Sequence, residues 1–152
     1  MDEQPQHDRP TDTTEVVLGP LVVELADAVE CQIEEDARRD VSYALGLRHR
    51  PDSVALADLT DRLLTHCIAL APFIELIPEA ERPQRGTAAL TAWARLREAG
   101  PEDGPRGNWS YARGLAVAAH DMVEALRERR RTARTARFVG RETLPPVAAD
   151  TP

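Results

Sequence analysis

The sequence predicts an all-α fold, an antiparallel four-helix bundle with disordered N- and C-terminal tails. Apolar residues recur at steps of three and four along most of the chain, which is the spacing of one side of an α-helix. No stretch alternates long enough to predict a strand, and clusters of glycine and proline separate four helical segments. Four helices with short connections favour an antiparallel bundle.

The length of 152 residues predicts a single domain. We expect this helical domain over residues 15–138, with helices at about 20–46, 53–78, 83–99 and 109–137. The two ends of the chain, residues 1–14 and 139–152, are rich in polar residues and proline. They cannot bury enough apolar surface to offset the entropy of ordering, so we expect both to be disordered.

The first expected helix begins at Pro20, because the first helical position needs no backbone N–H, and ends at Gly46, a good left-handed cap. Its apolar residues recur mostly at steps of four. We expect them to form one side that faces the core: Leu21, Leu25, Val29 or Ala28, Ile33, Ala37, Val41 and Ala44.

The second expected helix is capped by Asp52 or Ser53 and carries the longest apolar seam in the chain. We therefore expect it to be the central helix of the bundle. Pro72 removes one backbone hydrogen bond, but the seam continues beyond it, so a kink is expected there and the helix ends at Pro78. The seam consists of Leu56, Leu59, Leu63, Cys67, Leu70, Ile74 and Ile77.

The third expected helix begins at Pro83 and closes at Gly100, which a proline follows. A loop with many glycines and prolines then leads to the fourth helix, capped by Asn108 or Ser110. Its apolar side ends at Leu126, after which arginines dominate.

Composition narrows the cellular setting and the chemistry. The formal net charge is −7, and arginine supplies the whole basic side, since the chain contains no lysine. Lysine chemistry, such as a Schiff base, is therefore excluded. Cys31 and Cys67 form no CxxC pair, and the N-terminus is acidic, unlike a signal peptide. The longest uncharged central run, residues 63–74, is too short for a membrane span. We expect a cytoplasmic protein without a membrane partner.

An arginine cluster ends the last expected helix: Arg127, Arg129, Arg130, Arg131, Arg134 and Arg137. Residues 127–152 carry a net charge of +4, whereas the preceding 126 residues carry −11. One interpretation is structural, because cations at a helix C-terminus complement its dipole and Glu124 and Glu128 can pair with them. A second is contact with nucleic acid or an acidic partner. A third is pairing with the acidic first helix of another subunit.

The candidate catalytic residues form no complete set. His66-Cys67 is a potential metal pair, but neighbours on a helix point about 100° apart. His120-Asp121 is similar to the His-Asp pair of the all-helical HD phosphohydrolases, whose site also needs a later aspartate. Here only Asp150, in the expected tail, follows. We therefore assign no catalytic residue, cofactor or metal ligand.

Several packing motifs carry a family resemblance. Leu76-Ile77-Pro78-Glu79-Ala80-Glu81 follows the apolar second helix, Ala94-Arg95-Leu96 lies in the third, and Ala112-Arg113-Gly114-Leu115-Ala116 and residues 123–126 lie in the fourth. Over residues 56–128 the chain resembles a family of short all-helical proteins from high-GC bacteria, labelled natural-product-biosynthesis proteins. The resemblance implies a setting beside secondary-metabolite genes and no particular reaction.

These observations predict a non-enzymatic accessory protein in bacterial secondary metabolism or regulation, which binds a protein partner or itself. The alternative is a regulator that contacts nucleic acid through the arginine-rich end of the last helix. A more distant alternative is an HD-type metal-dependent phosphohydrolase using His49 or His66 as first ligand, with His120 and Asp121.

Overall fold

A computed structural model describes the backbone of residues 13–139 and the side chains of residues 19–136. Over these residues the chain is all-α, with four α-helices and no strand, which confirms the predicted fold class. The expected tails, residues 1–14 and 139–152, lie almost entirely outside the described residues. The elements are α1 (Thr13–Gly46), α2 (Ser53–Glu75), the 3₁₀ turn η1 (Glu79–Glu81), α3 (Gln84–Ala99) and α4 (Gly104–Val139).

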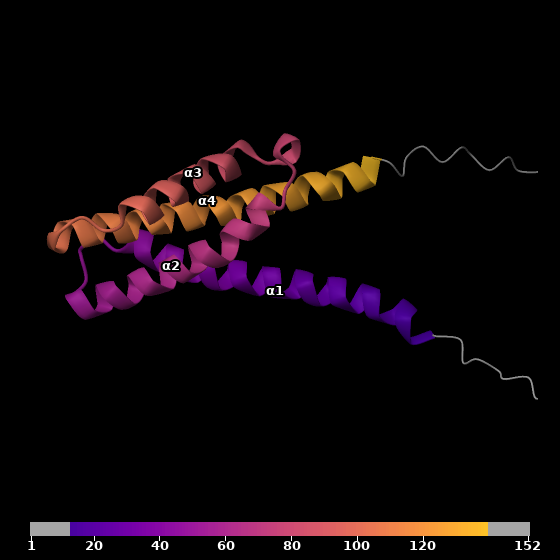
Figure 1. The fold of residues 1–152 in the computed structure, drawn as a ribbon, viewed down its shortest axis with the longest axis horizontal. Coiled ribbons are helices and arrows are strands. Elements are labelled where there is room, and N and C mark those ends of the chain that lie inside the picture. The colour runs from indigo at the N-terminus through magenta and orange to yellow at the C-terminus, as the bar shows by residue number, and fades with distance from the viewer. Residues whose placement is uncertain (1–12, 140–152) are drawn as a thin grey trace, which may run out of the picture. The chain divides into compact units, whose positions relative to one another are not determined.

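The chain divides into two compact units, residues 1–32 and residues 33–152, and α1 crosses the boundary between them. The second unit is a helical bundle in which the end of α1, then α2, α3 and α4 run in alternating directions (Figure 1). Side-chain contacts agree with the antiparallel order of α1 and α4, since Glu34 meets Arg130, whereas Leu47, just after α1, accepts from Arg113, which lies earlier on α4.

Helix α4, rather than α2, is the helix on which its neighbours pack. It lies along both α2 and α3, whereas α2 and α3 contact each other only slightly. The expectation that the second helix is central is therefore wrong. The physical reason is the alanine content of α4, because small side chains let two neighbouring helices approach it closely. The buried side of α4 consists of Ala112, Leu115, Ala116, Ala118, Ala119, Met122, Val123, Ala125 and Leu126.

The helix boundaries differ from expectation at two starts. Helix α1 begins at Thr13, so Pro20 lies inside it and removes the hydrogen bond to the Val16 carbonyl instead of opening the helix. Helix α4 begins at Gly104, where a positive φ of 85° suits glycine and Pro105 occupies an early position that needs no N–H. Helix α2 continues through Pro72, as its apolar seam predicts, but it ends at Glu75, before the expected end at Pro78.

The side chain of Arg82 holds the end of α2. Its Nε donates a hydrogen bond to the Ile74 carbonyl oxygen at 3.1 Å. Its Nη2 donates to the carbonyl oxygens of Glu75 at 3.1 Å and Ile77 at 3.0 Å. The last carbonyls of a helix lack partners within the helix, and a guanidinium matches several of them at once. Ile77 is fully buried beside this cap. The stretch Leu76–Glu81, which carries the family resemblance, therefore leads from the end of α2 to a residue that caps it.

Loss of this cap should destabilise the bundle. Arg82→Ala removes the Arg82 donor from the Glu75 and Ile77 carbonyl oxygens and one of two donors from that of Ile74, which still accepts from the Ile77 N–H. We therefore expect the free energy of unfolding to fall by about 2 kcal/mol, measured by urea denaturation. Arg85→Ala is the matched control, because the half-exposed Arg85 forms a surface ion pair with Asp121 at 3.9 Å, which is worth less than about 1 kcal/mol. Equal losses in the two variants would contradict the role of Arg82.

Candidate functional site

The arginine-rich end of α4 contains arginines in two different environments. Nη1 of Arg127 lies 3.1 Å from Oε1 of Glu124, one turn earlier on the same helix, as the structural interpretation of the cluster predicts. Arg130 instead reaches α1, where its Nη2 donates to Oε2 of Glu34. These two arginines therefore have partners within the bundle.

Glu34 is a buried carboxylate that sequence reasoning did not single out. Only 3% of the residue is exposed, and its Oε1 has no hydrogen-bond partner among the described residues. A buried charge without a counter-charge is strongly destabilising, so Arg130 is the group that permits Glu34 to be buried. The sequence did not indicate this burial, because Glu34 belongs to an acidic run, Glu34-Glu35-Asp36, that is typical of a solvent-exposed face.

The remaining arginines of the cluster lie at the surface. Arg129, Arg131 and Arg134 are exposed, and Arg137 belongs to α4 but its side chain lies outside the described residues. A role for these four in contacting a partner or nucleic acid stays a prediction.

The Glu34–Arg130 pair predicts unequal effects of neighbouring arginine substitutions. Arg130→Gln leaves the Glu34 carboxylate buried without its cation, so the free energy of unfolding should fall by about 3 kcal/mol. Arg131→Gln, the adjacent exposed control, should change it by less than about 0.5 kcal/mol. The double variant Glu34→Gln/Arg130→Gln should regain part of the loss, because no buried charge remains. Urea denaturation measures all three, and a double variant no more stable than Arg130→Gln would contradict the pairing.

The residues considered for metal binding occur apart from one another. Nε2 of His66 lies 2.8 Å from Oδ2 of Asp40, and Nε of Arg62 lies 3.4 Å from the same oxygen. His120 is exposed, and Asp121 lies near Arg85 on α3. Across the described part of the chain, no three His, Cys, Asp or Glu side chains are grouped as a metal site would require. The structure thus does not bring together the residues of the phosphohydrolase alternative.

The two cysteines differ in accessibility. Cys67 is fully buried, its Sγ lies 3.5 Å from the Leu115 carbonyl oxygen, and burial raises the pKa of its thiol to about 12. A thiol with this pKa is protonated at neutral pH and is a poor nucleophile. Cys31, on α1, is an exposed free thiol.

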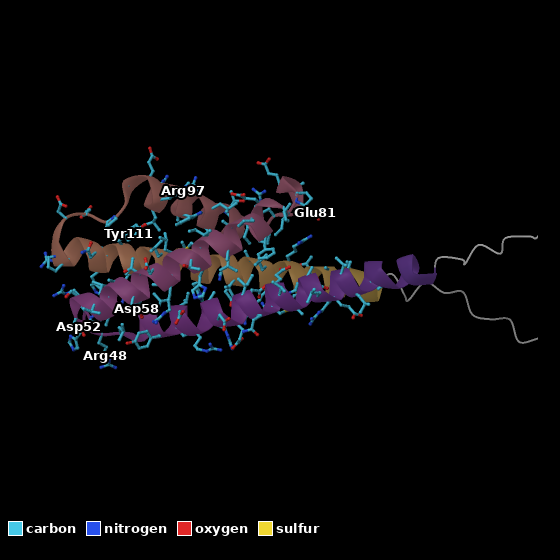
Figure 2. All side chains as sticks on the ribbon, turned by 60° about the horizontal axis from the view of Figure 1, so that its bottom comes forward. Arg48, Asp52, Asp58, Glu81, Arg97 and Tyr111 are labelled. Atoms are coloured by element: carbon cyan, nitrogen blue, oxygen red, sulfur yellow. The ribbon has the colours of Figure 1, made fainter. Side chains whose placement is uncertain are left out.

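A surface hollow of about 420 Å³ lies where α2 and α4 begin, with Arg50, Asp61, Asn108 and Tyr111 among its lining residues. Figure 2 labels Arg48 and Asp52 at this end of the bundle and Glu81 at the opposite end. Burial raises the pKa of the Tyr111 phenol, which keeps it protonated at neutral pH. The lining contains no cysteine or histidine, so the hollow offers no thiol nucleophile and no imidazole base.

The first half of α1 carries an exposed apolar surface. Leu21, Val22, Leu25 and Val29 are between 48% and 65% exposed, Val23 on another side of the helix is 60% exposed, and none of residues 19–29 is buried. Leu21, Leu25 and Val29 follow one another at steps of four, and Val22 precedes Val29 by seven, so all four share one side of the helix. We call these four residues the α1 stripe.

The α1 stripe corrects the predicted core face of the first helix. Ala37, Val41 and Ala44 are buried as expected, whereas Leu21, Leu25 and Val29 are not. A row of residues at steps of four turns by about 40° at each step, because each residue advances by about 100°. Leu21 and Ala37, sixteen residues apart, therefore point about 160° away from each other. Rotation alone does not explain the difference, because Val23 stands eighteen residues before Val41, on the same side of the helix, and is 60% exposed. Residues 19–29 are exposed on every side of the helix, so none of the predicted core residues among them is buried.

The α1 stripe lies in an acidic segment. Residues 13–32 contain Glu15, Glu24, Asp27 and Glu30 and no basic residue. No helix within residues 13–139 is long and apolar enough to cross a lipid bilayer.

Comparison with known proteins gives one match. A family model described as a family of unknown function (DUF6415) matches residues 35–139, which extend from the bundle-forming part of α1 to the end of α4. No curated protein and no solved structure matches the chain significantly. The α1 stripe precedes the matched residues.

Proposed function

Because the chain belongs to a family of unknown function (DUF6415), we propose a function from its own surfaces: it is a non-enzymatic helical protein that binds a protein partner through the α1 stripe. The bundle serves as the scaffold that presents this helix. The proposed setting is bacterial secondary metabolism or its regulation in the cytoplasm, which rests on the sequence resemblance around Leu76–Glu81.

The observation that carries the proposal is the exposure of four large aliphatic side chains on one side of a helix. Covering a leucine or valine is worth about 2 kcal/mol when it is fully exposed, so these half-exposed residues represent about 1 kcal/mol each. Contiguous exposed apolar surface of this kind marks interaction sites.

Helix stability supports the same conclusion. Isolated helices shorter than about 12–15 residues are marginal in water, and most helices are stabilised by packing an apolar side. Residues 13–32 form a helical segment of 20 residues that contains Pro20, and the apolar side chains described in it, from residue 19 onward, are exposed. A partner on the α1 stripe supplies the missing packing.

A charge placed in the α1 stripe should abolish partner binding. We expect Leu21→Glu/Leu25→Glu to raise the dissociation constant at least tenfold for a partner captured from native lysate, identified by mass spectrometry and purified for calorimetry. Val54→Glu is the matched control, because Val54 is 78% exposed on α2, outside the α1 stripe. Equal binding by the stripe variant and the control would contradict the proposal.

A second candidate, a regulator that contacts nucleic acid, is favoured by the exposure of Arg129, Arg131 and Arg134 near the end of α4. Arg127 and Arg130 form ion pairs with Glu124 and Glu34. The three exposed arginines do not take part in these two pairs. They provide a basic surface on an otherwise acidic chain, which is a condition for phosphate contact.

This candidate predicts that the protein binds DNA and that its affinity for DNA falls steeply as the salt concentration rises. Arg129→Gln/Arg131→Gln/Arg134→Gln should abolish the retention without lowering stability, since none of the three is buried. Arg38→Gln/Arg39→Gln, which removes exposed arginines from α1, is the control and should retain DNA. Fluorescence anisotropy with a labelled duplex measures both, and retention that survives the triple substitution would exclude this candidate.

A further inference from the structure

We propose that the partner of the α1 stripe is a second copy of this chain, so that the first halves of two α1 helices pair side by side in a symmetric dimer. The inference rests on the proposed function and names its partner. It concerns residues 13–32 only and does not require any rearrangement of the bundle.

The shape of the α1 stripe is suited to pairing with itself. A symmetric dimer places the same patch of both copies in contact, so the patch must be complementary to itself. Leu21, Val22, Leu25 and Val29 are all aliphatic, and Leu25 lies midway between Leu21 and Val29. Two α1 helices centred at Leu25 therefore bring Leu25 against Leu25 whether they run parallel or antiparallel. Leucine and valine against their own kind pack well in paired helices.

The charges of the segment are placed where self-pairing does not oppose them. Asp27 is two residues from both Leu25 and Val29, which puts it about 200° around the helix from each. Glu24 and Glu30 stand beside Leu25 and Val29 and point about 100° away from them. Pairing through the α1 stripe therefore leaves these carboxylates in water. A basic partner gains little at a surface whose acids face elsewhere, which favours a second copy over a cationic helix.

The small size of the proposed interface indicates a weak dimer. The α1 stripe extends over about 12 Å and the whole segment over about 30 Å, at about 1.5 Å per residue. A pair of helices of this length buries less than the roughly 800 Å² per partner of a standard interface. We therefore expect a dimer that dissociates in about the micromolar range and not a permanent assembly.

The test is sedimentation equilibrium of the full chain from about 1 to about 100 μM, which spans the expected dissociation constant. Native chain and Val54→Glu should shift from monomer to dimer over this range. Leu25→Glu should weaken the dimer at least about 100-fold, because it sets two carboxylates against each other in an apolar contact. A native chain that stays monomeric, or a dimer that Leu25→Glu leaves intact, would overturn the inference.

Cross-linking locates the contact independently. In a Cys31→Ser background, Leu25→Cys should form a disulfide-linked dimer on mild oxidation, whereas Asp27→Cys, on the opposite side of the same helix, should not. Cys67 does not interfere, because it is fully buried and its thiol is protonated at neutral pH. Equal cross-linking at the two positions would contradict pairing through the α1 stripe. A monomer that still binds another protein through the α1 stripe would overturn the dimer and leave the proposed function standing.

Discussion

The bundle depends on the buried side of α4. Helices α2 and α3 contact each other only slightly, so each is held mainly by packing against α4. Alanines such as Ala116 and Ala119 allow this double contact, and Leu115, Met122 and Leu126 provide the apolar volume. Gly86 on α3 shows how close the packing is. A Cβ atom there would lie 3.2 Å from the Ile74 side chain on α2 and 3.3 Å from that of Ala125 on α4.

Helix α1 joins this core differently. The buried residues Ala37, Val41 and Ala44 are small, so α1 contributes less apolar volume than α2 does. Polar contacts fix it at two levels: Asp40 meets His66 on α2, and Glu34 meets Arg130 on α4. Because Arg130 lies one turn beyond Leu126, the ion pair begins where the apolar core ends. Polar contacts depend on geometry more than apolar ones do, so they set the position of α1 along its neighbours.

Part of this organisation was predictable from sequence because it is local. The apolar seam of α2 identified its buried side, and the choice between Asp52 and Ser53 as its cap is resolved in favour of Asp52, whose carboxylate accepts from two backbone N–H groups. The burial of Glu34 was not predictable, because its partner lies 96 residues away in sequence. Arg130 and Arg131 are equivalent in sequence, and only the side of α4 that faces α1 distinguishes them. The predicted core face of α1 was wrong in its first half, because residues 19–29 are exposed on every side of the helix and periodicity does not show where along a helix the packing ends.

The two units of the chain differ in what stabilises their helices. Residues 35–139, which match the family model, include the side chains that form the apolar core. The α1 stripe lies before them, in a segment that exposes its apolar side. The proposed partner binding through the α1 stripe therefore concerns this chain and does not extend to its family. Because packing on the partner also stabilises the helix, part of the binding energy is offset by the ordering of that segment. Substitutions in the α1 stripe should act on association and leave the bundle's own stability unchanged.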